Sequence, residues 1–175
     1  MKSACFVASL LASALLAAGC ASFDGRGLQP GKSTEQDVVK SMGQPDQRLT
    51  LPNGDTALYF SRLPEGRAMY VATVSSDGVL RGIDQRLDYA NIKRIVPNNS
   101  TANEVREILG PPWRVTHMGR LKRDVWEYPW RIGEDRRILW VQLSADGVVR
   151  EVIEMHDYES DPPSGADSDG GMGTP

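Results

Sequence analysis

The middle of the chain repeats one pattern of residues, and this repetition limits the folds available to it. Thr34–Val38 (TEQDV) corresponds to Thr101–Val105 (TANEV) at an offset of 67 residues. Ser75–Arg81 (SSDGVLR) corresponds to Ser144–Arg150 (SADGVVR) at an offset of 69. The second copy therefore has two more residues than the first between these two motifs. Self-similarity of this kind is typical of copies of one supersecondary unit that stack to bury a common core.

We therefore predict two tandem units, over residues 27–87 and 88–157. Each unit opens with the signals of a short helix, because a threonine is followed three residues later by an acidic residue, as in a capping box. A glycine in the left-handed conformation and then a proline are expected to end that helix. These marker residues are Thr34, Asp37, Gly43 and Pro45 in the first unit and Thr101, Glu104, Gly110 and Pro112 in the second. A further short helix is expected over Tyr89–Ile95.

Three strands are predicted after the helix in each unit, from short apolar or alternating segments. They are Ala57–Ser61, Met69–Ser75 and Val79–Arg86, then Val125–Tyr128, Ile138–Ser144 and Val148–Met155. Asp77-Gly78 and Asp146-Gly147 are typical of hairpin turns. The expected fold class is α+β: two tandem α(α)βββ repeats, each a three-stranded antiparallel sheet covered by helix on one face.

Residues 1–19 have the pattern of a secretory signal. Lys2 precedes the apolar run Ala4–Ala18, which is about five residues short of the ~20 that a membrane-spanning helix needs. The run ends in Leu16–Cys20 (LAAGC), which resembles a bacterial lipobox. The resemblance implies cleavage before Cys20 and attachment of a diacylglycerol and an acyl chain such as palmitate to this residue. Ala21 at the next position implies retention at the outer membrane.

We therefore expect a lipoprotein signal peptide followed by a lipidated tether over residues 20–26. Two or three acyl chains on one residue make anchoring effectively permanent. The protein is expected at the periplasmic face of the outer membrane. At the other end, residues 158–175 are rich in Pro, Gly, Ser and Asp and predict a disordered acidic tail.

Composition argues against several classes of function. Residues 157–175 hold five acidic residues and no basic one, so the rest of the chain is nearly balanced in charge and gives no reason to expect nucleic-acid binding. His117, His156, Cys5 and Cys20 are too few and too dispersed for most metal sites or nucleophilic triads. We expect no enzymatic activity, no metal and no cofactor beyond the covalent lipid.

The four tryptophans all lie in the second unit, and the alignment of the units sorts them. It pairs Trp126 with Leu58, Trp140 with Val71, Trp113 with Asp46 and Trp130 with Arg62. Trp126 is therefore expected in the core, whereas Trp113 and Trp130 are expected to be exposed and are candidates for binding a partner. Trp140 alternates with Leu139 and Val141, so it is expected on the open face of the sheet. Simple packing remains the alternative for each of the three candidates.

Basic residues gather around two predicted loops of the second unit: Arg120, Lys122, Arg123, Arg131, Arg136 and Arg137. Guanidinium groups suit phosphate or carboxylate recognition, so Arg120, Arg123 and Arg131 are further partner-binding candidates. A basic patch of this kind can attract anionic head groups. The favoured interpretation is a solvated face with local ion pairs to Asp124, Glu134 and Asp135.

The order of these motifs behind a lipobox is similar to the BamE (SmpA/OmlA) family of lipoproteins, and the double unit resembles the architecture of the β-lactamase inhibitory protein. The matching residues of the second unit are Thr101, Glu104, Val105, Leu109, Gly110, Pro112, Trp126, Tyr128, Asp146, Gly147 and Val148. Those of the first are Gly31, Thr34, Asp37, Val38, Gly43, Pro45, Asp77, Gly78 and Val79. The chain has two units where that family has one, and it adds the acidic tail.

The resemblance implies an accessory lipoprotein of the outer-membrane β-barrel assembly machinery that binds a partner protein and phosphatidylglycerol head groups. We expect a non-catalytic interaction scaffold in barrel assembly or envelope integrity. Two alternatives stay open. The protein is an inhibitor of a periplasmic enzyme, or it is a module that binds anionic phospholipids.

Overall fold

The structure is a computed structural model that describes residues 23–158. The predicted signal peptide, the lipidation site Cys20 and the acidic tail beyond Tyr158 lie outside these residues. Within residues 23–158, no helix is both long enough and apolar enough to cross a bilayer.

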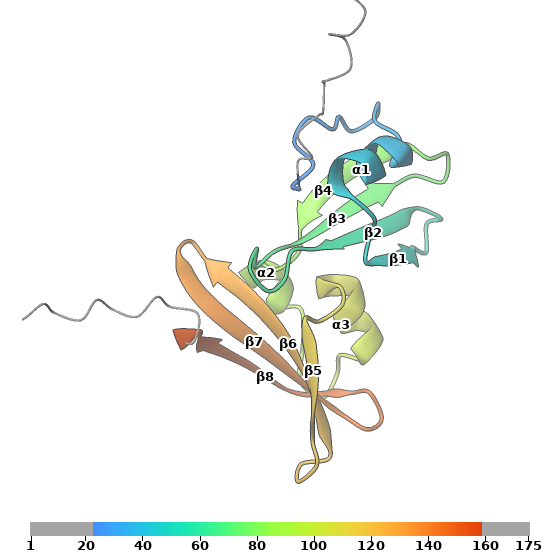
Figure 1. Cartoon of the computed structure of the whole chain (residues 1–175). Coiled ribbons are helices and arrows are strands. Elements are labelled where there is room, and N and C mark those ends of the chain that lie inside the picture. The colour runs from blue at the N-terminus through green and yellow to red at the C-terminus, as the bar shows by residue number, and fades with distance from the viewer. Residues whose placement is uncertain (1–22, 159–175) are drawn as a thin grey trace, which may run out of the picture.

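The described residues form two antiparallel sheets and three short helices, so the α+β class is confirmed (Figure 1). The first sheet has the order β1 (Gln47–Thr50), β2 (Thr56–Ser61), β3 (Met69–Val74), β4 (Leu80–Gln85). The second sheet has the order β5 (Arg114–Met118), β6 (Arg123–Ile132), β7 (Asp135–Ser144), β8 (Val149–His156). The helices are α1 (Glu35–Met42), α2 (Tyr89–Ile92) and α3 (Ala102–Leu109).

Each sheet has four strands, not the three expected from the sequence. The additional strands are the edge strands β1 and β5, which pair with β2 and β6. Their sequences, QRLT and RVTHM, are mostly polar, and β5 is exposed along most of its length. An edge strand whose side chains stay in water has no need of the apolar alternation by which strands are recognised.

The capping signals are confirmed in both longer helices. Thr34 accepts a hydrogen bond from the backbone of Asp37, whose carboxylate accepts one in return, and Thr101 and Glu104 do the same. Gly43 and Gly110 follow with φ of 91° and 82°, but their ψ values of −168° and −169° are extended. The expected positive φ is thus present, although the residues occupy an extended glycine-only region and not the left-handed helical one.

The elements stack as four layers: α1, the first sheet, the helices α2 and α3, and the second sheet (Figure 1). One face of the first sheet packs on α1, through Leu58, Phe60 and Ala72 against Val38 and Met42. Its other face joins the larger cluster that includes α3 and the inner face of the second sheet. The first sheet is therefore buried on both faces, whereas the second sheet has its helical cover on one face only.

Helix α3 is held between the sheets at its C-terminal end. Tyr59 of the first sheet donates a hydrogen bond to the Glu107 carbonyl (2.8 Å), and Tyr128 of the second sheet donates one to the Gly110 carbonyl (3.1 Å). These carbonyls belong to the end of a helix, where intrahelical partners run out. Burial raises the pKa of both tyrosines, so both hydroxyls stay protonated and remain donors.

Candidate functional site

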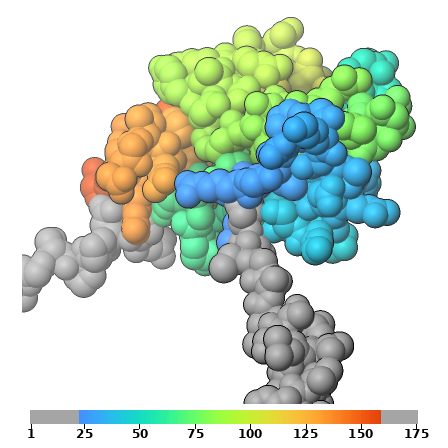
Figure 2. All heavy atoms as spheres, turned by 90° about the horizontal axis from the view of Figure 1, so that it is seen from above, coloured from blue at the N-terminus to red at the C-terminus, as the bar shows by residue number. Residues whose placement is uncertain are grey.

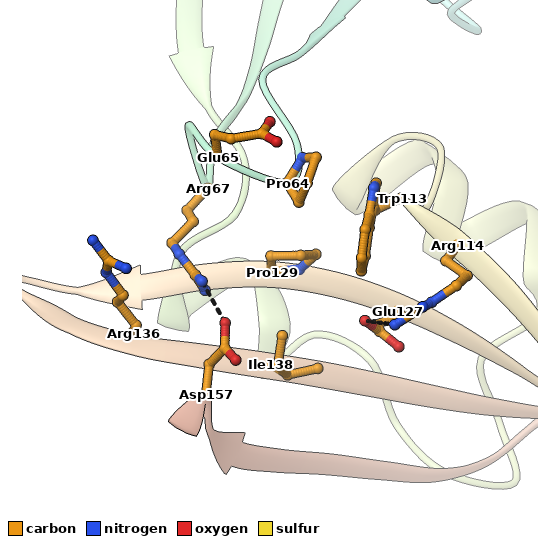
Figure 3. A pocket seen from close by; sticks show the side chains of 10 residues that line it. All are labelled: Pro64, Glu65, Arg67, Trp113, Arg114, Glu127, Pro129, Arg136, Ile138 and Asp157. Atoms are coloured by element: carbon orange, nitrogen blue, oxygen red, sulfur yellow. Dashed lines mark hydrogen bonds and ion pairs between the residues drawn. The ribbon is translucent and has the colours of Figure 1, made fainter. Parts of the chain in front are cut away.

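The outer face of the second sheet carries a groove of ≈ 450 Å³ where it meets the β2–β3 loop of the first sheet (Figure 3). The lining residues come from widely separated parts of the chain: Pro64, Glu65, Arg67, Trp113, Arg114, Glu127, Pro129, Arg136, Ile138 and Asp157. Since both sheets contribute, the groove exists only when the two halves of the chain are packed together.

The centre of the groove is apolar. Figure 3 shows Pro64, Trp113, Pro129 and Ile138 facing one another across it. Pro129 and Ile138 are opposite each other in the β6–β7 pair and form its floor. Trp113 remains 40% exposed, and the Arg114 guanidinium lies 4.4 Å from the centre of its ring. An exposed tryptophan in a groove is the kind of side chain that dominates binding energy at protein interfaces.

A buried ion pair closes one end of the groove. Arg67, from the β2–β3 loop, bonds the carboxylate of Asp157, which follows β8. The same guanidinium donates to the Arg137 carbonyl (3.1 Å) and the Trp130 carbonyl (3.4 Å). One side chain of the first half therefore bonds three separate points of the second half.

The other end of the groove is marked by Glu127, which is almost fully buried. Its carboxylate accepts hydrogen bonds from Arg114 (2.9 Å) and from the indole of Trp140 (3.2 Å). The three side chains fix one another on the outer face of β5, β6 and β7. The Arg67–Asp157 pair and the Arg114–Glu127–Trp140 contacts thus hold both ends of the groove in place.

Three of the four tryptophans lie where the sequence predicts. Trp126 belongs to the buried core, and Trp113 is exposed and lines the groove. Trp140 lies on the face opposite Leu139 and Val141, beside the groove, and orients Glu127.

Trp130 contradicts its prediction of exposure, because it is completely buried. The alignment paired it with Arg62 and assumed that the two positions have equal surroundings. They do not, since Trp130 faces the core between the two sheets, whereas Arg62 lies near the N-terminal segment. Trp130 therefore serves packing and cannot contact a partner directly.

The basic residues do not form one patch. Arg120 and Lys122 lie in the β5–β6 turn, whereas Arg131 and Arg136 lie at the opposite end of the ten-residue strand β6, where it turns into β7. Arg137 forms one of the local pairs that the sequence favoured, with Asp135 (2.7 Å). Arg123 pairs instead with Glu151 (3.3 Å), which was not among the predicted partners. Of the group, only Arg136 lines the groove.

The two histidines each face an aspartate. His117 lies 2.8 Å from Asp124, and His156 lies 2.9 Å from Asp135, whose pKa is held below its usual range by Arg137 and by His156 itself. No three potential metal ligands meet within residues 23–158.

Arg67, Glu127 and Asp157 were not candidates at the level of sequence, although they define the ends of the groove. No local pattern marks them, because each meets its partner only through tertiary contacts. Pro129 carried a weak signal, since a proline inside an apolar strand is unusual and needs a position where no ladder donor is required.

Comparison with known proteins adds little. No family model matches the chain, and no curated protein matches it. Among solved structures, a DUF4309 family protein (YjgB) from Bacillus subtilis matches with 19% identity and a TM-score of 0.30, over 75% of this chain and 84% of that one. A likeness this weak transfers neither fold nor function.

Proposed function

We propose that the protein is a lipid-anchored, non-catalytic interaction scaffold of the outer membrane, and that it binds an extended segment of a partner protein in the Trp113 groove. The observation that carries this proposal is the groove itself. Its exposed tryptophan and apolar floor lie between two fixed ion pairs.

The shape and chemistry of the groove favour a peptide ligand. Pro64, Trp113 and Pro129 offer flat, rigid surfaces that lose little conformational entropy when a ligand packs on them. The mixed charges at the rim, from Glu65 to Arg136, can meet polar backbone or either sign of side chain. A groove of ≈ 450 Å³ holds one or two apolar side chains of a bound segment.

The proposed location at the outer membrane is based on the lipobox-like sequence that ends in Cys20. Together with the BamE-like order of motifs, it makes the β-barrel assembly machinery the partner that we propose. We also propose that the two halves are copies of one unit, because Thr34–Val38 and Thr101–Val105 repeat one motif.

Substitution in the groove tests the proposal. Ile138→Glu places a charge on the groove floor, whereas the matched control Ile132→Glu places it at an exposed position near the end of the same hairpin, outside the groove. The full-length lipoprotein is purified from detergent-solubilised envelopes, and co-purifying barrel-assembly proteins are quantified.

We expect Ile138→Glu to lose these proteins and Ile132→Glu to retain them, with similar melting temperatures. Equal retention by both variants, or absence of barrel-assembly proteins from the unmodified protein, would contradict the proposal.

A further inference from the structure

The N-terminal segment is fixed to the body immediately after the predicted lipid anchor. The Arg62 guanidinium donates hydrogen bonds to the Phe23 carbonyl (3.2 and 3.3 Å) and to the Met42 carbonyl (2.9 Å). It also lies 4.9 Å from the centre of the Phe23 ring. Two residues further on, Gly25 is buried with a positive φ against Ile83. The segment thus joins the body from Phe23 onward.

Arg62 carries a positive charge that no carboxylate balances within the part of the chain that the structure describes. Its partners there are backbone carbonyls and one aromatic ring. Nearby, Asp24 is paired with Arg26 (2.8 Å), and the Asp46 carboxylate accepts a hydrogen bond from the Ser61 backbone (2.6 Å). The bonds of Arg62 therefore serve to hold the N-terminal segment and the end of α1 together.

Phe23 is 64% exposed and lies three residues after Cys20. Three residues span at most about 10 Å when fully extended. A lipid on Cys20 therefore brings Phe23 to the depth of the lipid head groups, where an aromatic ring and a guanidinium are both favourable.

We propose that Phe23, held in place by Arg62, forms an anchor surface that rests on the bilayer and holds the body in one orientation. This inference rests on the proposed lipidation of Cys20. The bonds from Arg62 to the Phe23 carbonyl fix the anchor to the body, and the exposed Phe23 ring faces the lipid head groups. Figure 2 shows the N-terminal part of the chain, in blue, on the face of the molecule that is seen from above.

The opposite end of the molecule then points away from the membrane. Figure 1 shows the β5–β6 turn at the far end from the N-terminal segment. Leu121 in this turn is 56% exposed and serves as a distant reference position. The fixed orientation presents the groove to partners at a constant height above the bilayer.

The test compares two labelling positions on the full lipidated chain, Arg26→Cys and Leu121→Cys. Each introduced thiol is labelled with an environment-sensitive fluorophore, and the protein is reconstituted into phosphatidylcholine vesicles that carry a head-group quencher, with and without an anionic phospholipid. We expect strong quenching at position 26 and none at position 121.

The variant Arg62→Gln, made in the Arg26→Cys protein, is expected to lose most of the quenching. The control Arg81→Gln removes an exposed arginine elsewhere in the first sheet, which pairs with Asp55, and should leave the quenching unchanged. Equal quenching at positions 26 and 121, or no effect of Arg62→Gln, would overturn the inference.

Mass analysis of the N-terminal peptide separates this inference from the proposed function. A lipidated Cys20 without quenching at position 26 would overturn the orientation alone. An unmodified Cys20 would overturn both the orientation and the membrane anchoring.

Discussion

Arg67 joins the two halves of the molecule through three polar contacts. Its side chain is almost fully buried and bonds Asp157 and the carbonyls of Trp130 and Arg137. A buried ion pair is costly to form but far costlier to break on one side, because the remaining charge is left without its partner. The groove wall formed by the β2–β3 loop depends on this contact.

Replacing Arg67 with Met is therefore expected to lower the free energy of unfolding by roughly 3 kcal/mol. The matched control is Arg48→Met, which breaks an exposed pair with Glu35 and should cost less than about 1 kcal/mol. Urea denaturation of both variants measures the difference. Similar midpoints would show that the Arg67–Asp157 pair does not join the halves.

Alanine substitutions at Gly110 and Gly43 distinguish the cost of an unfavourable backbone conformation from the cost of a steric clash. Both have positive φ, but only at Gly110 would an added Cβ meet neighbours, Tyr59 at 2.9 Å and Met69 at 3.0 Å. Alanine at either position should cost about 1 kcal/mol for the unfavourable φ, and Gly110→Ala should cost about 1–3 kcal/mol more for the clash. Thermal melting of the two variants tests this, and a Gly43→Ala variant as unstable as Gly110→Ala would refute it.

At the scale of elements, local signals made the helices and hairpins predictable. Thr34 and Thr101 identify helix starts because each cap lies within four residues of its partner, and Asp146-Gly147 identifies a turn for the same reason. The strands β1 and β5 were missed because their exposed side chains show no alternation. Alternation of apolar and polar residues reflects burial of one face of a strand, so an edge strand exposed to water does not show this pattern.

The cap of α3 offers a prediction at this scale, since this helix lies between both sheets. Thr101→Ala removes the acceptor for the Glu104 backbone and should lower the free energy of unfolding by about 1 kcal/mol. Asn103→Ala, two residues further along the same turn and exposed, should have no destabilising effect. The midpoints of guanidinium-induced unfolding of the two variants test this prediction. An unchanged midpoint for Thr101→Ala would contradict the role of the cap.

At the scale of the whole molecule, the groove could not be predicted from the sequence. Its walls join Pro64 and Arg67 to Trp113, Glu127 and Asp157, and no pattern in the chain relates positions so far apart. Trp113 was identified because its counterpart in the first unit is polar. The same argument failed for Trp130, because the two sheets have different neighbours.

Acid stability is a property of the whole fold. Four aspartates have a pKa below the ordinary value of 3.8 because each accepts hydrogen bonds. The donors are Thr34 for Asp37, Ser75 for Asp77, Ser144 for Asp146 and the Arg137 guanidinium for Asp135. A depressed pKa in the folded state gives stability that is present above the ordinary pKa and is lost as the pH falls below it.

We therefore expect the melting temperature to drop between about pH 5 and pH 2. In Asp37→Asn, which has already lost the titrating cap, the drop should be shallower. A melting temperature that is flat over this range, or an equal slope in the variant, would contradict this origin of the acid sensitivity.

The central claim is that a partner protein binds in the Trp113 groove of the anchored molecule. A photo-reactive phenylalanine analogue at position 113, introduced into the full-length protein in cells, tests this most directly. The matched control is the same analogue at Val115, which is more exposed (52% against 40%) but does not line the groove. We predict a discrete crosslink to an envelope protein from position 113 and none from position 115. Equal labelling from both positions, or no crosslink from position 113, would contradict the claim.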